Sequence, residues 1–478
     1  MNAPLRKVVI AALVMFGALL VNANVVQVGQ ASSLKNNPHN VRVLYAEYSH
    51  QRGPIVAGKS AVATSIATKD ALKYLRTYGR GPIYAPITGW YSLTYGFSGI
   101  EQAENSILSG NSDKLFAKRI SDAFTGRQPQ GGAVVLTINP KVQQVAYNAM
   151  GGKRGAVVAL DPRTGAILAM VSTPSYNPSN ISTHSSISNT RWWNAYMHDP
   201  AQPMLNRAIS QTYPPGSTFK VITTAAALAS GKYNPNTVIP APNKLTFPNG
   251  KPLSNFAGET CSPSQKETLR DALRQSCNTA YAKLGIAVGS DAIQKQAQAF
   301  GFGQALHIPM VTARSNVPLE RDAPFVAQEA IGQHDDAVTP LQMAMVAAGI
   351  ANHGVVMKPY VVAQERAPDS SVLSQAQPQE LGRAVSESIA SDLTSMMQTV
   401  VQNGTGTAAQ IPGVAVAGKT GTAQHNGPAP YTWFISFAPA ADPQVAVAVV
   451  VENTDPHGTG GTVAAPIAKQ VMEAAIGG

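Results

Sequence analysis

The sequence predicts a mixed α/β (α+β) fold in which a five-stranded antiparallel sheet is flanked by helices, together with an N-terminal pedestal domain and a membrane-spanning helix. Two β-rich runs at 155–171 precede a long stretch with helical periodicity, and three strand-like runs at 414–452 follow it. One sheet assembled from both ends of a unit accounts for all five. The apolar run near the N-terminus and the Gly- and Pro-broken elements after it predict the remaining two parts.

Length and composition limit the number of domains. The chain has 478 residues, of which 44% are apolar and 13% are charged, so it exceeds one ordinary globular domain. We assign 1–30 to a short cytoplasmic stub and a transmembrane anchor, 31–140 to the pedestal domain, and 141–478 to the main domain. The net charge of +10 is scattered without basic runs or an aromatic ladder, which excludes a nucleic-acid-binding class.

The N-terminal segment has the pattern of an export signal. Arg6 and Lys7 precede an apolar run that begins at Val8 and continues, with polar interruptions, to Val28. A retained span to Val28 has about the 20 residues that a bilayer requires, whereas the uninterrupted core at 8–21 has the length of a cleavable signal peptide. Both alternatives stay open, and both place the bulk of the chain outside the cytoplasm.

The elements of the predicted sheet can be placed individually. The first two strands form a hairpin around the turn-forming pentapeptide Asp161–Gly165. The later strands are expected at Val414–Val416, Thr432–Phe437 and Val445–Glu452, and a closing helix at Ala464–Ala475.

A serine and a lysine three residues apart form the first candidate catalytic pair. Two prolines and a glycine lead to Ser217, and a helix-compatible run then extends to Gly231. Ser217 is therefore expected to open a helix, with Lys220 on the same face and within reach. A desolvated lysine with a lowered pKa can take the proton of a serine hydroxyl. The alternative is a serine N-cap followed by a surface lysine.

The second candidate is the segment Ser276-Cys277-Asn278. Ser264 and Glu267 form a capping-box pattern before one helix, and another helical run follows Asn278. Ser276 and Asn278 are therefore expected in a corner between two helices. There a hydroxyl can relay a proton to a leaving amine, and an amide can hold a peptide carbonyl. Taken alone the pair is unspecific, because turns are rich in Ser and Asn.

The third candidate is the segment from Gly418 to Thr422, which continues a strand-like run. Extended backbone places Lys419 and Gly421 on one side of the strand, and Thr420 and Thr422 on the other. Such a strand can pair with an extended peptide, while Lys419 attracts a terminal carboxylate and Gly421 leaves room for close approach.

A nucleotide-binding alternative rests on the same segment, because 413–420 satisfies the P-loop expression G-x-x-x-x-G-K-[ST]. A P-loop requires a strand before the first glycine and a helix that opens at the lysine. Ile411-Pro412 is not strand-like, and the residues after Thr420 include Gly421 and Pro430, which cannot form the first turns of a helix. This alternative is therefore rejected.

In this order, the S-x-x-K, S-x-N and K-T-G motifs resemble those of the penicillin-recognising serine enzymes. The resemblance covers nearly the whole chain and is greatest to class B penicillin-binding proteins, particularly the actinobacterial penicillin-binding protein A group. It implies the penicillin-binding fold, with a dimerisation or pedestal domain at 31–140 and a transpeptidase domain at 141–478. Supporting stretches are Arg52–Ile55, Gly96–Glu101, Asp161–Gly165, Thr339-Pro340 and Gly421–Gln424.

The resemblance implies a role for each motif residue in a peptidoglycan DD-transpeptidase. Ser217 is expected to be acylated by the penultimate D-Ala of a stem peptide, with Lys220 as base and Ser276 as proton relay. The backbone N–H groups of Ser217 and Thr422 are expected to form the oxyanion hole. Substrate or β-lactam binding is assigned to Asn278, Lys419, Thr420, Gly421 and Thr422.

The resemblance also implies partners and alternatives. The expected ligands are stem peptides ending in D-Ala-D-Ala and β-lactam antibiotics, and no cofactor is implied. The protein is expected as a single-pass plasma-membrane protein with an extracytoplasmic catalytic domain. Because the E-D-x-x-F-x-x-H signature of a fused glycosyltransferase is absent, the expected partners are a membrane glycosyltransferase and division or elongation proteins. A DD-carboxypeptidase, a weak β-lactamase and a non-catalytic β-lactam-binding scaffold are the alternatives.

The cysteines and histidines complete the candidate residues. Cys261 and Cys277 are the two cysteines, and in an exported chain they can form a disulfide that fixes the corner around Ser276; two buried thiols are the alternative. No metal site is expected, because none of the nine histidines has a partner at i, i+4. The triplet His334-Asp335-Asp336 is interpreted as a polar loop.

Overall fold

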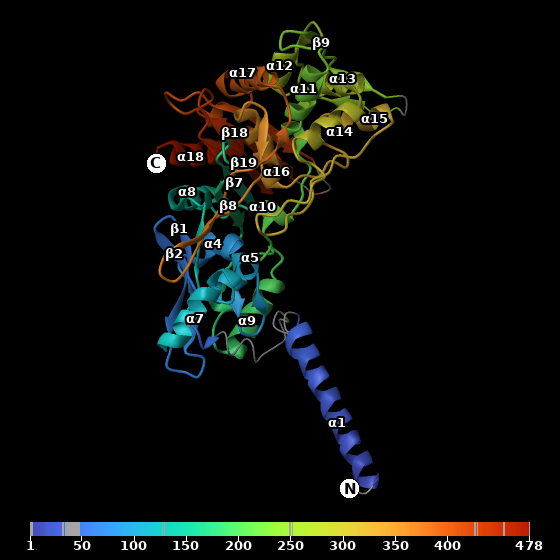
Figure 1. Ribbon diagram of the computed structural model, residues 1–478. Helices are drawn as coiled ribbons and strands as arrows, with labels where there is room; N and C mark the ends of the chain where they lie inside the picture. Colours follow the sequence, from blue (N-terminus) through green and yellow to red (C-terminus); the bar gives the residue numbers. More distant parts are fainter. Residues whose placement is uncertain are drawn as a thin grey trace.

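The computed structural model describes residues 3–30, 33, 48–126, 128, 130–247, 250, 252–424, 427, 429–452 and 455–477. Its main domain is built on an antiparallel sheet of five strands in the order β17-β18-β19-β7-β8, which confirms that both ends of the unit contribute to one sheet (Figure 1). The strands are β7 (Gly155–Leu160), β8 (Ile167–Thr173), β17 (Ala417–Ala423), β18 (Tyr431–Ala438) and β19 (Val445–Glu452).

The predicted start of the third strand was wrong by three residues. β17 begins at Ala417, whereas Ile411 and Val414 form an isolated bridge around Pro412-Gly413. Proline has no N–H and its φ is fixed, so a Pro-Gly pair turns the chain before the ladder begins.

Helices cover both faces of this sheet. On one face, α8 (Pro140–Met150) and α18 (Ala465–Ile476) pack together and share a core with alternate side chains of the strands. On the other face lies α16 (Pro340–Ala351), in which all twelve residues are buried. A helix that is apolar all round belongs in the interior, so α16 forms the centre of the main domain.

The helical insert lies beyond α16 and supplies two of the three motifs (Figure 1). Its helices are α11 (Lys220–Ala229), α12 (Leu269–Gln275), α13 (Asn278–Val288), α14 (Ser290–Ala299), α15 (Ala323–Glu329) and α17 (Glu387–Asn403). Short strands join them at β9 (Val238–Pro240), β10 (Lys244–Thr246), β11 (Pro252–Ser254), β12 (Lys266–Thr268), β13 (Val355–Met357) and β16 (Glu380–Arg383). Of the two helices before them, α10 (Arg207–Ser210) contacts β7 and β8, and α9 (Ser186–Met197) lies beside the pedestal, where Trp193 stacks on Tyr95.

The pedestal contains a six-stranded sheet in the order β15-β14-β6-β1-β2-β3. Four of its strands lie within the predicted range 31–140, but β14 and β15 come from far beyond residue 140. The strands are β1 (Ile55–Ala57), β2 (Ser60–Ala67), β3 (Tyr74–Tyr78), β6 (Ala133–Leu136), β14 (Val362–Arg366) and β15 (Val372–Gln375). The pedestal sheet is therefore not made by one continuous segment.

Helices and a buried charge cluster complete the pedestal. Beside the sheet lie α4 (Gly81–Thr88), α5 (Gly99–Ala103), α6 (Asn105–Leu108) and α7 (Phe116–Thr125), with short strands β4 (Tyr91–Ser92) and β5 (Gly96–Phe97). In the core, the carboxylate of Glu101 accepts hydrogen bonds from Arg52 and Arg76, both at 2.6 Å, and from Tyr78. Pairing with two guanidinium groups keeps the pKa of this buried carboxyl low although burial opposes it.

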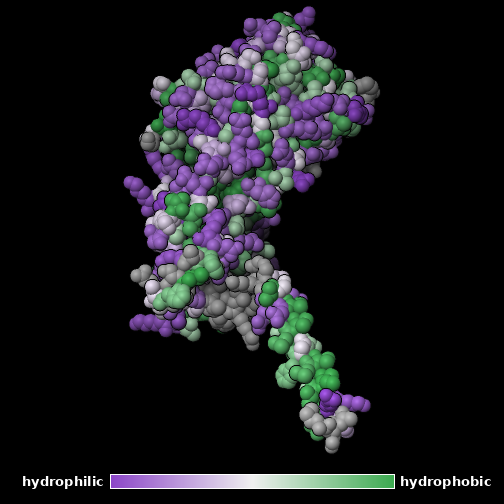
Figure 2. Space-filling view, in the orientation of Figure 1, coloured by the Kyte–Doolittle hydropathy of each residue, from purple (hydrophilic) through white to green (hydrophobic). Residues whose placement is uncertain are grey.

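The N-terminal segment forms α1 (Ala3–Asn24), which continues as a π-helical turn (Val25–Gly29). The stretch Pro4–Gly29 has 26 residues and is long and apolar enough to cross a membrane, and none of its most apolar window is buried in the protein. Figure 2 shows its apolar surface projecting from a largely polar body. The predicted start of the pedestal at residue 31 lies outside the described residues.

Candidate active site

Ser217 lies in a tight turn at the amino end of α11. The turn Gly216–Thr218 is a 3₁₀ helix that leads into α11 at Lys220, so Ser217 lies at the start of a helical segment as expected, in its 3₁₀ turn. Gly216 takes a left-handed backbone conformation with φ of 53°, and its N–H donates to the carbonyl oxygen of Gly332 at 2.8 Å. Ser217 is partly exposed, and its hydroxyl has no hydrogen-bond partner among the described residues.

Two residues of the sheet hold this turn against the strands. The indole N–H of Trp433 on β18 donates to the carbonyl oxygen of Pro214 at 3.0 Å. On β17, a Cβ added at Gly421 would lie 2.9 Å from Cγ2 of Thr218 and 3.0 Å from the carbonyl oxygen of Pro215. Glycine at 421 therefore lets β17 lie directly against the nucleophile turn. The sequence analysis expected that space to serve a ligand.

The side chain of Lys220 reaches the corner between α12 and α13. Its ammonium group donates to the carbonyl oxygen of Ser276 at 2.6 Å, to Oδ1 of Asn278 at 2.7 Å, and to Oγ of Ser276 at 3.3 Å. No hydrogen bond joins it to Ser217. The side chain is fully buried, and burial, followed by the nearby charge of Lys419, lowers the pKa of Lys220 well below its ordinary value. A lysine in this state can serve as a base.

Ser276 lies between α12 and α13, as predicted, but the residue that caps the start of α12 differs from the prediction. α12 begins at Leu269, and its N-cap is Thr268, whose hydroxyl accepts from the N–H of Asp271. The predicted capping box of Ser264 and Glu267 was wrong, because those residues lie in the turn and strand before the helix. Ser276 ends α12 with a left-handed φ of 64°, and this sharp turn directs its side chain to the lysines.

Lys419, on β17, also contacts Ser276. Its ammonium group donates to Oγ of Ser276 at 2.8 Å and to the carbonyl oxygen of Thr420 at 2.9 Å. The side chain is fully buried, which lowers the pKa of Lys419 to about 7. The structure thus brings one residue from each motif, Lys220, Ser276 and Lys419, into one hydrogen-bonded group.

The remaining predicted binding residues lie around this group. Oγ1 of Thr420 is buried and bonds to Oγ1 of Thr405 at 2.6 Å, so this hydroxyl faces the loop after α17. Oγ1 of Thr422 accepts from the N–H of Gly460 at 3.3 Å. The amide nitrogen of Asn278 donates to the carbonyl oxygen of Ser254 at 3.4 Å. β17 forms an edge of its sheet, as the addition of an extended peptide requires.

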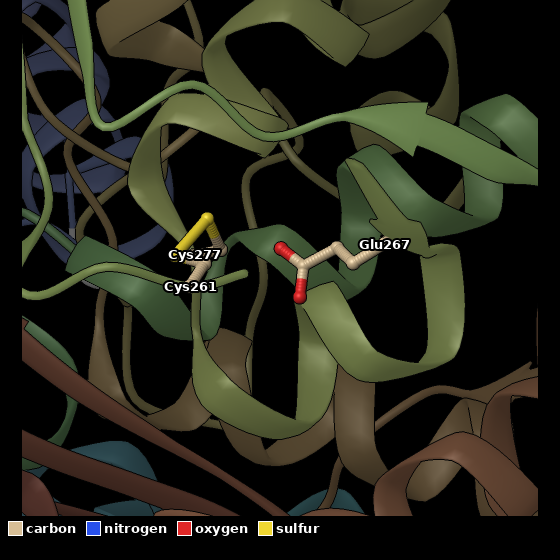
Figure 3. Close-up of side chains that lie close together, drawn as sticks. All are labelled: Cys261, Glu267 and Cys277. Atoms are coloured by element: carbon tan, nitrogen blue, oxygen red, sulfur yellow. A yellow bond between two sulfur atoms is a disulfide. The ribbon is translucent and has the colours of Figure 1, made fainter. Parts of the chain in front are cut away.

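A disulfide and a buried glutamate lie behind the corner (Figure 3). The sulfur atoms of Cys261 and Cys277 are bonded, and the carboxylate of Glu267 faces them. One carboxylate oxygen and the two sulfur atoms all lie within 4.8 Å of one another. One oxygen of Glu267 accepts from Gln275 at 2.8 Å, and the other is buried without a partner among the described residues. Burial, followed by the charge of Asp271, raises the pKa of Glu267 to about 7.

The sequence did not predict a second hydrogen-bonded group, which is centred on Glu452. Glu452, at the end of β19, accepts from the hydroxyl of Tyr213 at 2.8 Å and from Nε of Arg207 at 3.0 Å, and so fixes the chain that leads into the nucleophile turn. Glu452 is far from Arg207 and Tyr213 in the sequence, and the three residues share no motif. The sequence signal for Glu452 is its position as an acid directly after seven consecutive apolar residues, at the end of the predicted strand.

Comparison with known families gives two matches. The model described as "Penicillin binding protein transpeptidase domain" matches residues 155–473, and the one described as "Penicillin binding protein A dimerisation domain" matches 52–134. The chain belongs to the penicillin-binding-protein transpeptidase family. It is a class B penicillin-binding protein, as the motifs predicted.

Relatives of this penicillin-binding protein span its whole length. It is 46% identical to the peptidoglycan D,D-transpeptidase PbpA of Mycolicibacterium smegmatis, over 100% of this chain and 99% of that protein. It is 44% identical to PbpA of Mycobacterium tuberculosis over 100% of both. The penicillin G acyl-enzyme complex of M. tuberculosis penicillin-binding protein A superposes with a TM-score of 0.86, covering 90% of this chain and 100% of that one.

Proposed function

We propose that this chain is a peptidoglycan D,D-transpeptidase that forms an acyl-enzyme on Ser217 with stem peptides and with β-lactams. The family and the named relatives support the class of reaction. The observation that supports the assignment of residues is the hydrogen-bonded group of Lys220, Ser276 and Lys419, which lies beside the nucleophile turn.

In the proposed reaction, Oγ of Ser217 attacks the carbonyl carbon of the penultimate D-Ala and gives its proton to Lys220. Burial keeps the pKa of Lys220 low, so its neutral form can accept this proton. The proton then passes through the hydroxyl of Ser276 to the nitrogen of the leaving D-Ala as the C–N bond breaks. An amine of a second stem peptide attacks the acyl-enzyme, forms the cross-link and restores Ser217.

Binding roles follow from charge and strand geometry. Lys419 attracts the terminal carboxylate, and Thr422, on the same edge strand, supplies a hydroxyl for it. Asn278 holds the acyl amide, and the N–H groups of Ser217 and Thr422 stabilise the oxyanion. We assign Thr420 a supporting role, because its hydroxyl bonds to Thr405 and lies within 3.5 Å of the Lys419 ammonium group.

We further propose that α1 is retained as a single plasma-membrane span with the catalytic domain outside the cytoplasm. The two basic residues before the apolar run and the bonded cysteines support this orientation. A membrane glycosyltransferase then supplies the glycan strands that are cross-linked, and division or elongation proteins recruit the two enzymes.

The test is the intact mass of the full chain after incubation with penicillin G, followed over hours, alongside Ser217→Ala. A stable one-to-one adduct that depends on Ser217 supports the proposal. Rapid loss of the adduct would indicate a carboxypeptidase or β-lactamase instead, and no adduct would indicate a non-catalytic scaffold.

A further inference from the structure

A buried asparagine outside the three motifs contacts the corner of Ser276 and Asn278. Asn255 directly follows β11, and its side chain is only 7% exposed. The residue before it, Ser254, already contacts the corner, because its carbonyl oxygen accepts from the amide nitrogen of Asn278. Buried side-chain amides are normally hydrogen-bonded, so the partners of Asn255 indicate what this residue does.

The orientation of the Asn255 amide is fixed by one donor and one acceptor. Its Oδ1 accepts from the backbone N–H of Thr279 at 3.0 Å and from the hydroxyl of Thr279 at 3.2 Å. Its Nδ2 donates to the carbonyl oxygen of Glu259 at 3.0 Å. A backbone N–H only donates and a carbonyl oxygen only accepts, so the reversed amide would lose both backbone bonds. The oxygen of Asn255 therefore faces α13.

This oxygen supplies a cap that α13 lacks. The N-cap residue of α13 is Cys277, whose side chain makes no capping hydrogen bond among the described residues and whose sulfur is bonded to Cys261 (Figure 3). The first N–H groups of a helix have no acceptor within the helix. Thr279 is the second residue of α13 and is fully buried, so its N–H needs the acceptor that Asn255 provides. Asn255 thus does from outside the helix what an N-cap asparagine usually does.

The capped turn contains Asn278, the first residue of α13. Oδ1 of Asn278 accepts from Lys220 at 2.7 Å, and its Nδ2 donates to the carbonyl oxygen of Ser254 at 3.4 Å. An amide nitrogen carries two hydrogens, so the second one is left for a ligand. The position of this hydrogen depends on where the first turn of α13 lies.

The segment that carries Asn255 is itself anchored on α13. Leu245 of β10 pairs with Leu253 of β11, and both side chains pack against a small core that includes Ala282 of α13. Asn255 therefore acts from a hairpin that is attached to the same helix one turn further along. Such an attachment can hold the end of the helix in one position.

We propose that Asn255 is a positioning residue for ligand recognition: it caps α13 and so holds the amide of Asn278 where that amide binds the acyl amide of a β-lactam or stem peptide. The inference rests on the proposed function, in which Asn278 has this binding role. The alternative is that Asn255 only stabilises the fold. A purely structural role would affect every ligand alike, whereas a positioning role changes the preference for ligands that have an acyl amide.

The test compares two β-lactams on the full chain in detergent. Penicillin G has an acyl amide, and aminopenicillanic acid has the same bicyclic nucleus and carboxylate with a free amine instead. Intact-mass kinetics give the second-order rate of acylation for each. We expect Asn255→Ala to slow acylation by penicillin G by roughly 10–100-fold, the usual effect of a small displacement of a binding group, and to change acylation by aminopenicillanic acid much less.

A double variant and a matched control complete the test. In an Asn278→Ala background, Asn255→Ala should cause no further loss with penicillin G, because the group that it positions is gone. Asn139→Ala is the control: Oδ1 of Asn139 caps α8 by accepting from the N–H groups of Lys141 and Val142, and α8 covers the other face of the sheet. It should lower the melting temperature and leave the preference for penicillin G unchanged.

The conservative variant covers the case in which Asn255→Ala does not fold. Asn255→Asp keeps an oxygen opposite the N–H of Thr279, although it loses the bond to Glu259, and should retain most of the preference for penicillin G. Loss of the preference in folded Asn255→Asp would overturn the proposal.

Three other results would also overturn it: an unchanged preference in folded Asn255→Ala, an equal loss with both β-lactams, or a full further loss in the Asn278→Ala background. Equal acylation of the wild type by the two β-lactams would overturn the role of Asn278 and this inference with it. Absence of any adduct in the wild type would instead contradict the proposed function, so the two failures are distinguishable.

Discussion

The ammonium group of Lys419 lies 2.8 Å from the hydroxyl oxygen of Ser276, and Nζ of Lys220 lies 3.3 Å from the same oxygen. When both lysines donate, both lone pairs of the serine oxygen are used, so its own proton points away from them. The hydroxyl of Ser276 is then free to donate to a leaving group in the cleft. This arrangement gives a proton relay its direction.

Removal of the Ser276 hydroxyl should slow acylation without unfolding the protein. We expect Ser276→Ala to reduce the second-order rate of acylation by penicillin G by roughly 10²–10⁴-fold, the usual contribution of a positioned proton donor. Ser276→Gly is the matched variant, since glycine accepts the φ of 64° without strain. Normal acylation in either variant would exclude the relay.

The pH profile should identify the two lysines. Acylation requires neutral Lys220, so the rate of the free enzyme should rise with pH through the lowered pKa of Lys220. It should fall again near pH 7, where Lys419 loses the charge that attracts the carboxylate. Because the two groups are coupled, the measured values belong to the pair.

Lys419→Arg tests the upper limb of this profile. A guanidinium group stays charged at all accessible pH values, so the decline above pH 7 should disappear even if the overall rate is lower. The control is Lys469→Arg on α18, which covers the other face of the sheet. If the acylation rate of Lys419→Arg still declined above pH 7, the decline would belong to a titrating group other than Lys419.

Glu267 should make stability depend on pH. Its pKa is raised in the folded state to about 7 from an ordinary value of 4.5, so its favourable contribution is complete below pH 4.5 and is lost as pH rises through 7. Glu267→Gln should therefore raise the melting temperature at pH 8 but not at pH 4.5. At pH 8 the free energy of unfolding should rise by about 1–3 kcal/mol in this variant. An equal change in melting temperature at both pH values would contradict the role of Glu267. So would the same pH-dependent change in Glu473→Gln, which alters an exposed glutamate.

The disulfide should support both stability and the active-site corner. Cys261 and Cys277 are separated by 16 residues, a loop whose closure contributes about 3 kcal/mol in the chain-entropy model. Cys261→Ser should lower the melting temperature and slow acylation, because Cys277 lies between Ser276 and Asn278. Differential scanning calorimetry measures the melting temperature, and intact-mass kinetics measures acylation. If neither changed in Cys261→Ser, the disulfide would have no role in stability or in the active-site corner.

The parts of the fold that sequence predicted are those decided by local pattern. The apolar strands β18 and β19 and the hairpin of β7 and β8 have strong periodic signals and short turns, and all four appear as expected. The corner at Ser276 follows from two adjacent helical runs. Each of these features depends on residues that are neighbours in the sequence.

The errors concern residues whose environment is made by distant segments. The space beside Gly421 is filled by the nucleophile turn, which comes from a distant part of the chain. The capping box failed because Glu267 pairs with Ile239 in a short strand instead of entering the helix. No local pattern specifies such tertiary contacts.

The backbone joins the pedestal to the catalytic sheet at β8. Ile167 of β8 donates to the carbonyl oxygen of Tyr360 just before β14, and the hydroxyl of Thr137, just after β6, bonds to the carbonyl oxygen of Ile167. β8 is one edge of the five-stranded sheet, and β17 is the other. The pedestal thus covers one edge of the five-stranded sheet, and the opposite edge, β17, is left open to pairing with a strand from another chain.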